Sequence, residues 1–289
     1  MNAVESYITV KPDIEVLRNH LQEQYAGIFD ADMIQRHIDE YIGLSNAHAF
    51  ASFLIDRGHV GQRMLDIGSG YGSIVLTARQ AGINALGIEM ATFEIDFARA
   101  RLHSDLPSDE PELVYRQGDA LDLPFAEGSF DLVTILNVIE HVPDYRLALA
   151  EAIRVLKPDG HLYIICPNYA AFRREAHYLV PWLPLLPRSL ASTYLKCLGR
   201  DPAFFEQHIH YCSYWGVLRT LRGLQLDIEY PYDSCLSDFD VIRRPYVRRL
   251  MKVLQRARLL GVVRIFLWVH FLNPLRPDIN ICAIKRRNA

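Results

Sequence analysis

The chain has 289 residues, a formal net charge of -3 at pH 7, and hydrophobic residues at 50% of its positions. This length can bury one substantial core, and the composition is that of a globular protein rather than of a disordered or fibrous one. The slightly negative charge gives no overall attraction to nucleic acid, so a nucleic-acid partner is not expected.

The first segment, residues 1–60, is expected to be helical. Ile34, Ile38 and Ile42 recur at helical spacing, and Phe50 and Leu54 belong to a second apolar stripe. We therefore expect an N-terminal helical segment in front of the first strand.

Residues 61–168 carry the pattern of an α/β core. Short apolar runs alternate with amphipathic helical stretches, which is typical of βαβ units that feed a parallel sheet. The clearest predicted helix follows Asp144, a good N-cap, and ends before Pro158 and Gly160. The predicted strands lie near residues 64–67, 85–88, 113–117, 132–136 and 161–166.

The next segment, residues 169–212, is rich in aromatic residues and prolines and includes the run VPWLPLLP. Aromatic rings offer apolar faces to sugars, lipids or other rings, so this insertion is expected to form a lid over an acceptor pocket. Packing within the core is the alternative role for the same rings.

The last segment, residues 213–289, is expected to complete the sheet. A helix is predicted near 214–224, and strands are predicted near 226–230 and 279–285. Between these strands, a basic helical insertion at about 236–275 ends in the apolar run FLWVHFL. Such a segment is expected to lie on an anionic membrane surface, to form a homodimer contact, or to be an ordinary helical appendage.

Cysteine usage and hydropathy indicate a location in the cytoplasm. The five cysteines are scattered and never spaced as CxxC, so neither a disulfide framework nor a zinc site is expected. The N-terminus lacks a basic stretch followed by an apolar run, and no apolar run of about 18 or more residues occurs. We expect a cytoplasmic protein without a membrane span, with peripheral contact to the inner face of the membrane as an option.

The strongest functional signal is the segment RMLDIGSGYGS. It places Asp66 at the end of a predicted strand and Gly68, Gly70 and Gly72 in the turn that opens the next helix. Glycines in such a turn let the backbone approach a ligand closely. Dinucleotide-binding enzymes use a similar turn, but their last glycine follows the second by three positions, whereas Gly72 follows Gly70 by two.

This segment resembles the cofactor-binding loop of class I S-adenosylmethionine-dependent methyltransferases. Later segments resemble the same family in order: Glu89 ends the second strand, Asp119 follows the third in GDALDLPF, and ILNVIEHVPD ends the fourth. The likeness is to the methyltransferase type 11 group, which includes ubiquinone and menaquinone biosynthesis enzymes. It implies a Rossmann-like three-layer α/β sandwich with a mostly parallel seven-stranded sheet, N-terminal helices, and helical insertions in the C-terminal half.

The resemblance also implies which residues bind S-adenosylmethionine. Glu89 is expected to accept hydrogen bonds from the ribose hydroxyls, and Asp119 from the adenine amino group. The full expected set is Asp66, Gly68, Ser69, Gly70, Tyr71, Gly72, Glu89, Met90, Asp119, Ala120, Asn137 and Val138.

A sulfonium methyl is intrinsically electrophilic, so the protein mainly has to align an acceptor and exclude water. A hydroxyl acceptor would also need a base, and His141 in EHV is the first candidate, with His208 and His210 in EQHIHYC behind it. Structural packing is the alternative role for each histidine. Metal-assisted quinone methyltransferases carry a carboxylate where this chain has Asn137, so no metal is expected.

The expected reaction is O-methylation of a small-molecule, glycan or lipid-linked hydroxyl compound. A diffuse likeness to bacterial methyltransferases of surface-glycan or lipid-linked assembly supports the last two acceptor classes. The alternatives are an oxidoreductase that binds NAD and a noncatalytic protein that binds the cofactor in an assembly.

Overall fold

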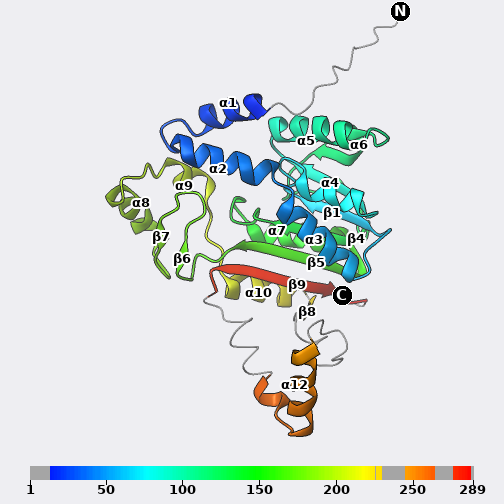
Figure 1. The fold of residues 1–289 in the computed structure, drawn as a ribbon. Helices are drawn as coiled ribbons and strands as arrows, with labels where there is room; N and C mark the ends of the chain where they lie inside the picture. Colours follow the sequence, from blue (N-terminus) through cyan, green and yellow to red (C-terminus); the bar gives the residue numbers. More distant parts are fainter. Residues whose placement is uncertain (1–13, 225, 230–244, 264–275, 288–289) are drawn as a thin grey trace, which may run out of the picture.

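The computed structural model describes residues 14–224, 226–229, 245–263 and 276–287. A seven-stranded sheet with strand order β3-β2-β1-β4-β5-β9-β8 forms its middle layer (Figure 1). The strands are β1 (Arg63–Ile67), β2 (Asn84–Glu89), β3 (Tyr115–Gln117), β4 (Phe130–Leu136), β5 (Leu156–Pro167), β8 (Leu226–Glu229) and β9 (Asp278–Lys285).

Strands β3, β2, β1, β4 and β5 pair in parallel, and β9 runs antiparallel to both of its neighbours, β5 and β8. The expectation of a mostly parallel seven-stranded sheet is therefore confirmed. Since parallel strands end at the same edge, the carboxyl ends of β1, β2, β3 and β4 lie together, which is where open α/β sheets bind ligands.

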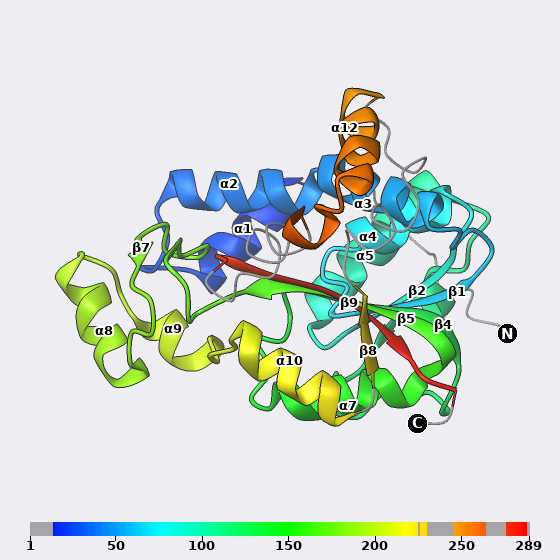
Figure 2. The same cartoon turned by 90° about the horizontal axis from the view of Figure 1, so that it is seen from below.

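Helices cover both faces of the sheet. Figure 2 shows α7 (Tyr145–Val155) and α10 (Tyr214–Gly223) on one face, with α3 (Ser45–Asp56), α4 (Ser73–Gln80) and α5 (Thr92–Asp105) on the other. Asp144 caps α7 by accepting from the backbone N–H of Arg146 at 2.9 Å, as its position in the sequence predicts.

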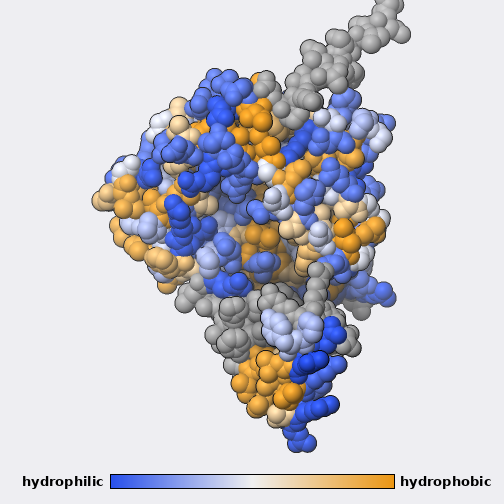
Figure 3. Space-filling model, viewed as in Figure 1, coloured by the Kyte–Doolittle hydropathy of each residue, from blue (hydrophilic) through white to orange (hydrophobic). Residues whose placement is uncertain are grey.

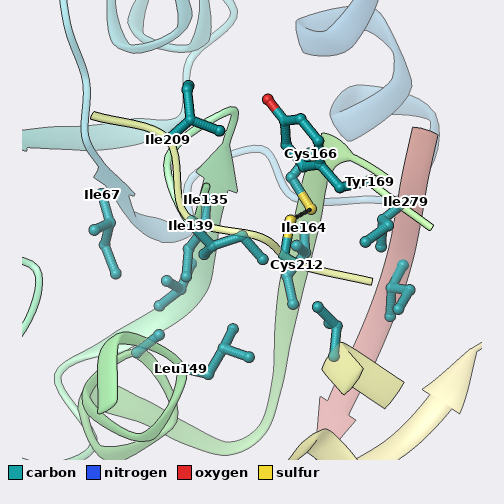
Figure 4. Packing of buried hydrophobic residues seen from close by; sticks show 14 of the residues in the cluster. Ile67, Ile135, Ile139, Leu149, Ile164, Cys166, Tyr169, Ile209, Cys212 and Ile279 are labelled. Atoms are coloured by element: carbon teal, nitrogen blue, oxygen red, sulfur yellow. Dashed lines mark hydrogen bonds between the residues drawn. The ribbon is translucent and has the colours of Figure 1, made fainter. Parts of the chain in front are cut away.

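The core on the α7 side is built from the apolar positions of the central strands. Ile135, Ile164 and Leu149 of α7 belong to one cluster (Figure 4), and all three side chains are fully buried. The same cluster extends to Cys166 and Cys212, whose sulfur atoms lie 3.8 Å apart as free thiols. The segment around residue 212 is thus fixed against the end of β5.

The N-terminal helices lie over the carboxyl edge of the sheet. Helix α1 (Ile14–Gln24) contacts α5 through His20, whose ring stacks on Phe93 at 3.6 Å between ring centres. Helix α2 (Ala31–Ile42) packs beside α1 in Figure 1, and Asp30 caps it through the N–H of Met33.

The segment expected to form a lid folds into a hairpin and two helices. The hairpin pairs β6 (Arg173–Arg174) with β7 (Pro181–Trp182), and α8 (Arg188–Cys197) and α9 (Ala203–His208) follow. It lies beside the sheet, at the same end as α2 (Figure 1).

The structure differs from the predicted elements at three places. Residues 111–114 form the short helix α6 (Pro111–Val114), because Pro111 is well placed in a first helical turn, so β3 is shorter than predicted. Strand β5 begins at Leu156, which pairs with Phe130, although the sequence predicts this strand only near residues 161–166. His208 ends helix α9, whereas the alternation of His208 and His210 in the sequence favours an extended segment.

Helix α12 (Pro245–Arg256) projects away from the rest of the molecule (Figure 1). It is part of the basic insertion predicted at 236–275, of which residues 236–244 and 264–275 lie outside the described residues. Across the described ranges, no helix is both long enough and apolar enough to cross a membrane.

Candidate functional site

The loop after β1 is shaped by two glycines. Gly68 has a φ of +70°, and a Cβ atom added to it would lie 2.3 Å from Cγ2 of Val138, so the β1 and β4 loops touch through a residue without a side chain. Gly70 has a φ of +49°, but a Cβ added there would meet nothing within 4 Å. The loop therefore packs tightly against the loop after β4 at Gly68 and is open at Gly70.

Glu89 ties this loop to the end of β2. Its Oε2 accepts the backbone N–H of Gly70 at 3.1 Å, and its Oε1 accepts those of Met90 at 2.7 Å and Ala91 at 3.1 Å. An ionised carboxylate offers about four lone-pair positions, so acceptor capacity remains for a ligand hydroxyl.

Asp66 lies inside the sheet below the loop. It is buried, its Oδ1 accepts the hydroxyl of Thr134 at 2.6 Å, and burial raises its pKa to about 7. Asp66 therefore supports the loop from beneath, whereas the other residues of the expected set lie in or next to the loops at the edge.

The acids and loops of the neighbouring strands reach the same edge. Asp119 is exposed after β3, and its Oδ1 accepts the N–H of Leu121 at 2.8 Å, beside Ala120. Met90 is exposed after β2, and Asn137 is exposed after β4 with a φ of +57°.

Two further loop residues are buried against the protein. The Ser69 hydroxyl is buried without a hydrogen-bond partner in the described part of the chain, and the Tyr71 ring stacks on Tyr41 of α2 at 4.6 Å. Helix α2 thus covers one side of the glycine loop. No pattern in the sequence predicts this contact.

The residues at this edge fit a nucleoside ligand. The open face at Gly70 admits a ligand against the backbone, and the spare acceptor capacity of Glu89 suits ribose hydroxyls. Asp119 presents a second exposed carboxylate one strand further along, where an amino group would be recognised. In the described ranges, no group of three or more His, Cys, Asp and Glu side chains has the arrangement to hold a metal ion.

His141 lies in the loop that follows β4, four residues after Asn137. Its Nδ1 donates to the carbonyl oxygen of His208 at 2.9 Å, which leaves Nε2 as the acceptor nitrogen, 4.0 Å from Oε1 of Glu140. Burial, assisted by the neighbouring His177, lowers the pKa of His141 to about 4. The ring is therefore neutral at physiological pH.

Glu140 is a buried carboxyl group directly before it. Burial raises its pKa to about 7, and its Oε2 is without a hydrogen-bond partner among the residues described. Such a group is costly to bury as an anion, and shifted carboxyl groups of this kind cluster at functional sites.

The structure adds His177 and Glu175, which the sequence did not mark as a pair. Glu175 is buried in the β6–β7 hairpin, and its Oε1 accepts Nδ1–H of His177 at 2.9 Å. The His177 ring centre lies 5.2 Å from that of His141 and 5.0 Å from that of Phe204. Only the fold brings this hairpin to the β4 loop.

The other two candidate histidines are placed differently from one another. His208 is exposed at the end of α9, with its ring centre 5.0 Å from that of Phe204. The backbone N–H of His210 donates to the carbonyl of Glu140 at 2.6 Å, and its side chain lines a separate pocket. The fold therefore groups His208 with His141 and His177, and sets His210 apart.

That pocket has a volume of about 720 Å³ and lies where α7, α8 and α10 begin. Its walls include Tyr145, Arg146, Arg188, His210 and Tyr211. The Arg188 guanidinium lies 4.7 Å from the centre of the Phe205 ring. The lining combines aromatic faces, cations and a histidine, as in sites for polar or sugar-like molecules.

Comparison with known proteins gives a family match in the α/β core. Residues 65–164 match the family described as "Methyltransferase domain". Similar sequences include norajmaline N-methyltransferase of Rauvolfia serpentina, 33% identical over 48% of this chain and 47% of that protein. Another is a demethylmenaquinone methyltransferase of Renibacterium salmoninarum, 32% identical over 46% of this chain and 54% of that protein. The chain spans about half the length of these curated relatives.

Solved structures share the fold. Phosphoethanolamine N-methyltransferase 2 of Haemonchus contortus, in complex with S-adenosyl-L-methionine, has a TM-score of 0.54 at 16% identity and covers 93% of this chain and 60% of its own. An S-adenosylmethionine-dependent methyltransferase of Mesorhizobium loti has a TM-score of 0.50 at 17% identity and covers 84% of this chain and 100% of its own. Residues 65–164 thus match a methyltransferase domain family, and the chain shares its fold with S-adenosylmethionine-dependent methyltransferases of known structure.

Proposed function

We propose that this protein transfers a methyl group from S-adenosylmethionine to a hydroxyl group of a small-molecule, glycan or lipid-linked acceptor. The observation that carries the proposal is the open glycine loop at Gly70, tied to Glu89 at the carboxyl edge of the sheet. The match of residues 65–164 to the methyltransferase family supports it and disfavours an oxidoreductase that binds NAD.

The protein's own residues bind the cofactor, orient it and shield it from water. Glu89 and Asp119 would hold the two ends of the nucleoside, while the backbone at Gly70 approaches it closely. When bound, the sulfonium supplies an electrophilic methyl group. Tyr41 and the rest of α2 shield the loop from water, which favours transfer to a positioned acceptor over side reactions.

The acceptor is proposed to enter from the β4 side, where His141, His177 and Phe204 gather. A base is needed for a hydroxyl acceptor, and the histidines at this end are suited to that role. The pocket next to His210 would hold a distal part of a larger acceptor, such as a sugar ring. The relatives include the 27-O-demethylrifamycin SV methyltransferase of Amycolatopsis mediterranei, named for an O-methyl transfer.

Incubation with cofactor labelled in its methyl group tests the reaction. The acceptor panel would contain free sugars, polyprenyl-linked sugars, phenols, quinols and amines, and mass spectrometry would locate the label. We expect label on a hydroxyl oxygen of one hydroxyl class. Label on nitrogen alone contradicts the O-transfer proposal, and normal cofactor binding with no transfer to any class favours the noncatalytic alternative.

Helix α12 is proposed to dock the protein on an anionic lipid surface. Its basic residues, Arg248, Lys252 and Arg256, recur every fourth position and share one face, and the helix contains no acidic residue. The opposite face exposes Leu250 at 55% and Val253 at 58%. Figure 3 shows the two faces as separate hydrophobic and hydrophilic surfaces on the projecting part. A helix with this division lies in the headgroup region with its cations near lipid phosphates.

Vesicle flotation tests this contact. We expect the protein to float with phosphatidylglycerol vesicles at low salt, to bind pure phosphatidylcholine weakly, and to be released by salt because surface charges are screened. Arg248→Glu with Lys252→Glu, or Leu250→Asp, should abolish flotation. The control Leu190→Asp, a residue 56% exposed on α8, should not. Absence of binding at low salt contradicts the proposal. If the wild-type protein is a dimer and Leu250→Asp makes it a monomer, the face is a homodimer contact instead.

A further inference from the structure

We infer that His177, held by Glu175, accepts the proton of the acceptor hydroxyl, an assignment that rests on the proposed methyl transfer. The sequence favoured His141 for this role. The geometry of the β6–β7 hairpin orients the His177 ring better for accepting a proton than the β4 loop orients the His141 ring.

The Glu175 side chain is an ionised carboxylate that hydrogen bonds hold in place. Its Oε2 accepts the backbone N–H groups of His177 and Tyr178, each at 2.7 Å, and its Oε1 accepts the hydroxyl of Tyr169 at 3.0 Å and Nδ1–H of His177 at 2.9 Å. Burial alone would raise the pKa of Glu175, but its interactions with His177, the N–H of Tyr178 and Arg173 lower it to about 2. The carboxylate is therefore charged and fully hydrogen-bonded.

This anion sets the state of the His177 ring. An ionised carboxylate can only accept hydrogen bonds, so Nδ1 must carry the proton and Nε2 the lone pair. The imidazolium that forms when Nε2 takes up a proton is stabilised by the adjacent negative charge. This is the arrangement of carboxylate and histidine by which a general base is oriented in acyl-transfer enzymes.

His141 lacks such a partner. The group on its Nδ1 is the neutral carbonyl of His208, and burial together with His177 lowers the pKa of its ring to about 4. A ring that resists protonation in this way is a poor proton acceptor at neutral pH. His141 is better suited to accept a hydrogen bond through Nε2 and position the acceptor.

The location of His177 matches the proposed role. Its ring contacts His141, whose loop begins at Val138 against the glycine loop, and Phe204, whose ring lies 5.4 Å from that of Tyr25 at the end of α1. His177 is thus partly buried between the β4 loop and the N-terminal cover, at the acceptor side of the cofactor edge.

Proton transfer to His177 accompanies the methyl transfer. Nε2 of His177 accepts the hydroxyl proton as the hydroxyl oxygen forms its bond to the methyl carbon. The electron pair of the broken carbon–sulfur bond stays on sulfur, which becomes a neutral thioether. The imidazolium then releases its proton to solvent.

Nitrogen NMR of the intact protein tests the ring state without an acceptor. We expect the neutral His177 ring to be protonated at Nδ1 and bare at Nε2, and Glu175→Gln to weaken this preference. Tyr169→Phe is the matched control, because it removes another hydrogen bond to the same carboxylate and leaves the His177 contact in place. Protonation at Nε2 in the wild-type protein would overturn the assignment.

Kinetics then separate the two histidines, using the acceptor class that takes up label. His177→Gln should lower kcat by about 10²- to 10⁴-fold, the usual range for a general base, with cofactor affinity unchanged by calorimetry. Glu175→Asp should retain more activity than Glu175→Gln. A folded His177→Gln protein with wild-type kcat would remove the assignment and leave methyl transfer intact, whereas a wild type that does not bind the cofactor would remove the proposed function itself.

The pH profile of kcat gives a further readout. Its acid limb should disappear in His177→Gln and persist in His141→Gln, since only the former removes the proton acceptor. The titratable groups that interact with His177 are His37 on α2, Glu140 and His141 after β4, and Glu175 in the hairpin. An unchanged limb in His177→Gln contradicts the inference.

Discussion

Alanine at Gly68 is expected to lower the free energy of unfolding by about 2–5 kcal/mol. An L-residue in the left-handed region costs about 1–2 kcal/mol, and forcing a methyl group into a packed contact costs about 1–3 kcal/mol more. The contact is with Val138, whose Cγ2 atom would lie 2.3 Å from the new Cβ. Urea unfolding followed by circular dichroism measures the loss.

The matched control is Gly128→Ala. Gly128 has a φ of +63°, but a Cβ added there meets nothing within 4 Å, so only the backbone cost of about 1–2 kcal/mol applies. Adding Val138→Ala to Gly68→Ala should recover part of the difference, because it removes the clashing methyl groups. Equal losses for Gly68→Ala and Gly128→Ala would show that the two loops do not meet as described.

Trp182→Ala should destabilise the protein by about 3–5 kcal/mol, the range for removing a large buried ring. Trp182 is fully buried, and its ring lies 5.6 Å from the rings of both Tyr169 and Phe205. This ring anchors the hairpin that carries Glu175 and His177, so the loss should also disturb their hydrogen bond. Thermal and urea unfolding measure the effect.

Trp215→Ala is the control for this change. Trp215 is 54% exposed on α10, and truncation of an exposed ring should change stability by less than about 0.5 kcal/mol. If both tryptophan variants lost the same stability, the hairpin would not be part of the core, and the fixed geometry of His177 would lose its support.

The sheet and the cofactor edge could be predicted because their signals are local. Apolar runs such as those ending at Ile67 and Leu136 mark buried parallel strands, and the glycine spacing marks the turn where the backbone must come close to a ligand. The family resemblance supplied the mostly parallel seven-stranded sheet, whereas the strand order follows from neither local signal and comes from the structure.

The acceptor side could not be predicted in the same way. His177 and His141 meet only because a hairpin after β5 folds back to the loop after β4, and no local period encodes that return. The clue available in the sequence was Glu175 two residues before His177, a spacing at which a carboxylate can cap the intervening turn and hold the ring. Likewise, the contact between Tyr41 and Tyr71 depends on how α2 packs, which helical periodicity does not specify.

Calorimetric titration with S-adenosylmethionine tests the central claim most directly, using wild type, Gly70→Ala and Gly128→Ala. Both variants place alanine at a positive φ with open space around the new Cβ, so they should lose similar stability. We expect wild type and Gly128→Ala to bind one equivalent of S-adenosylmethionine alike, Gly70→Ala to bind at least about 10-fold more weakly through the ligand clash, and NAD to give no heat. Binding of NAD in place of S-adenosylmethionine, or equal affinity in all three proteins, would contradict the account.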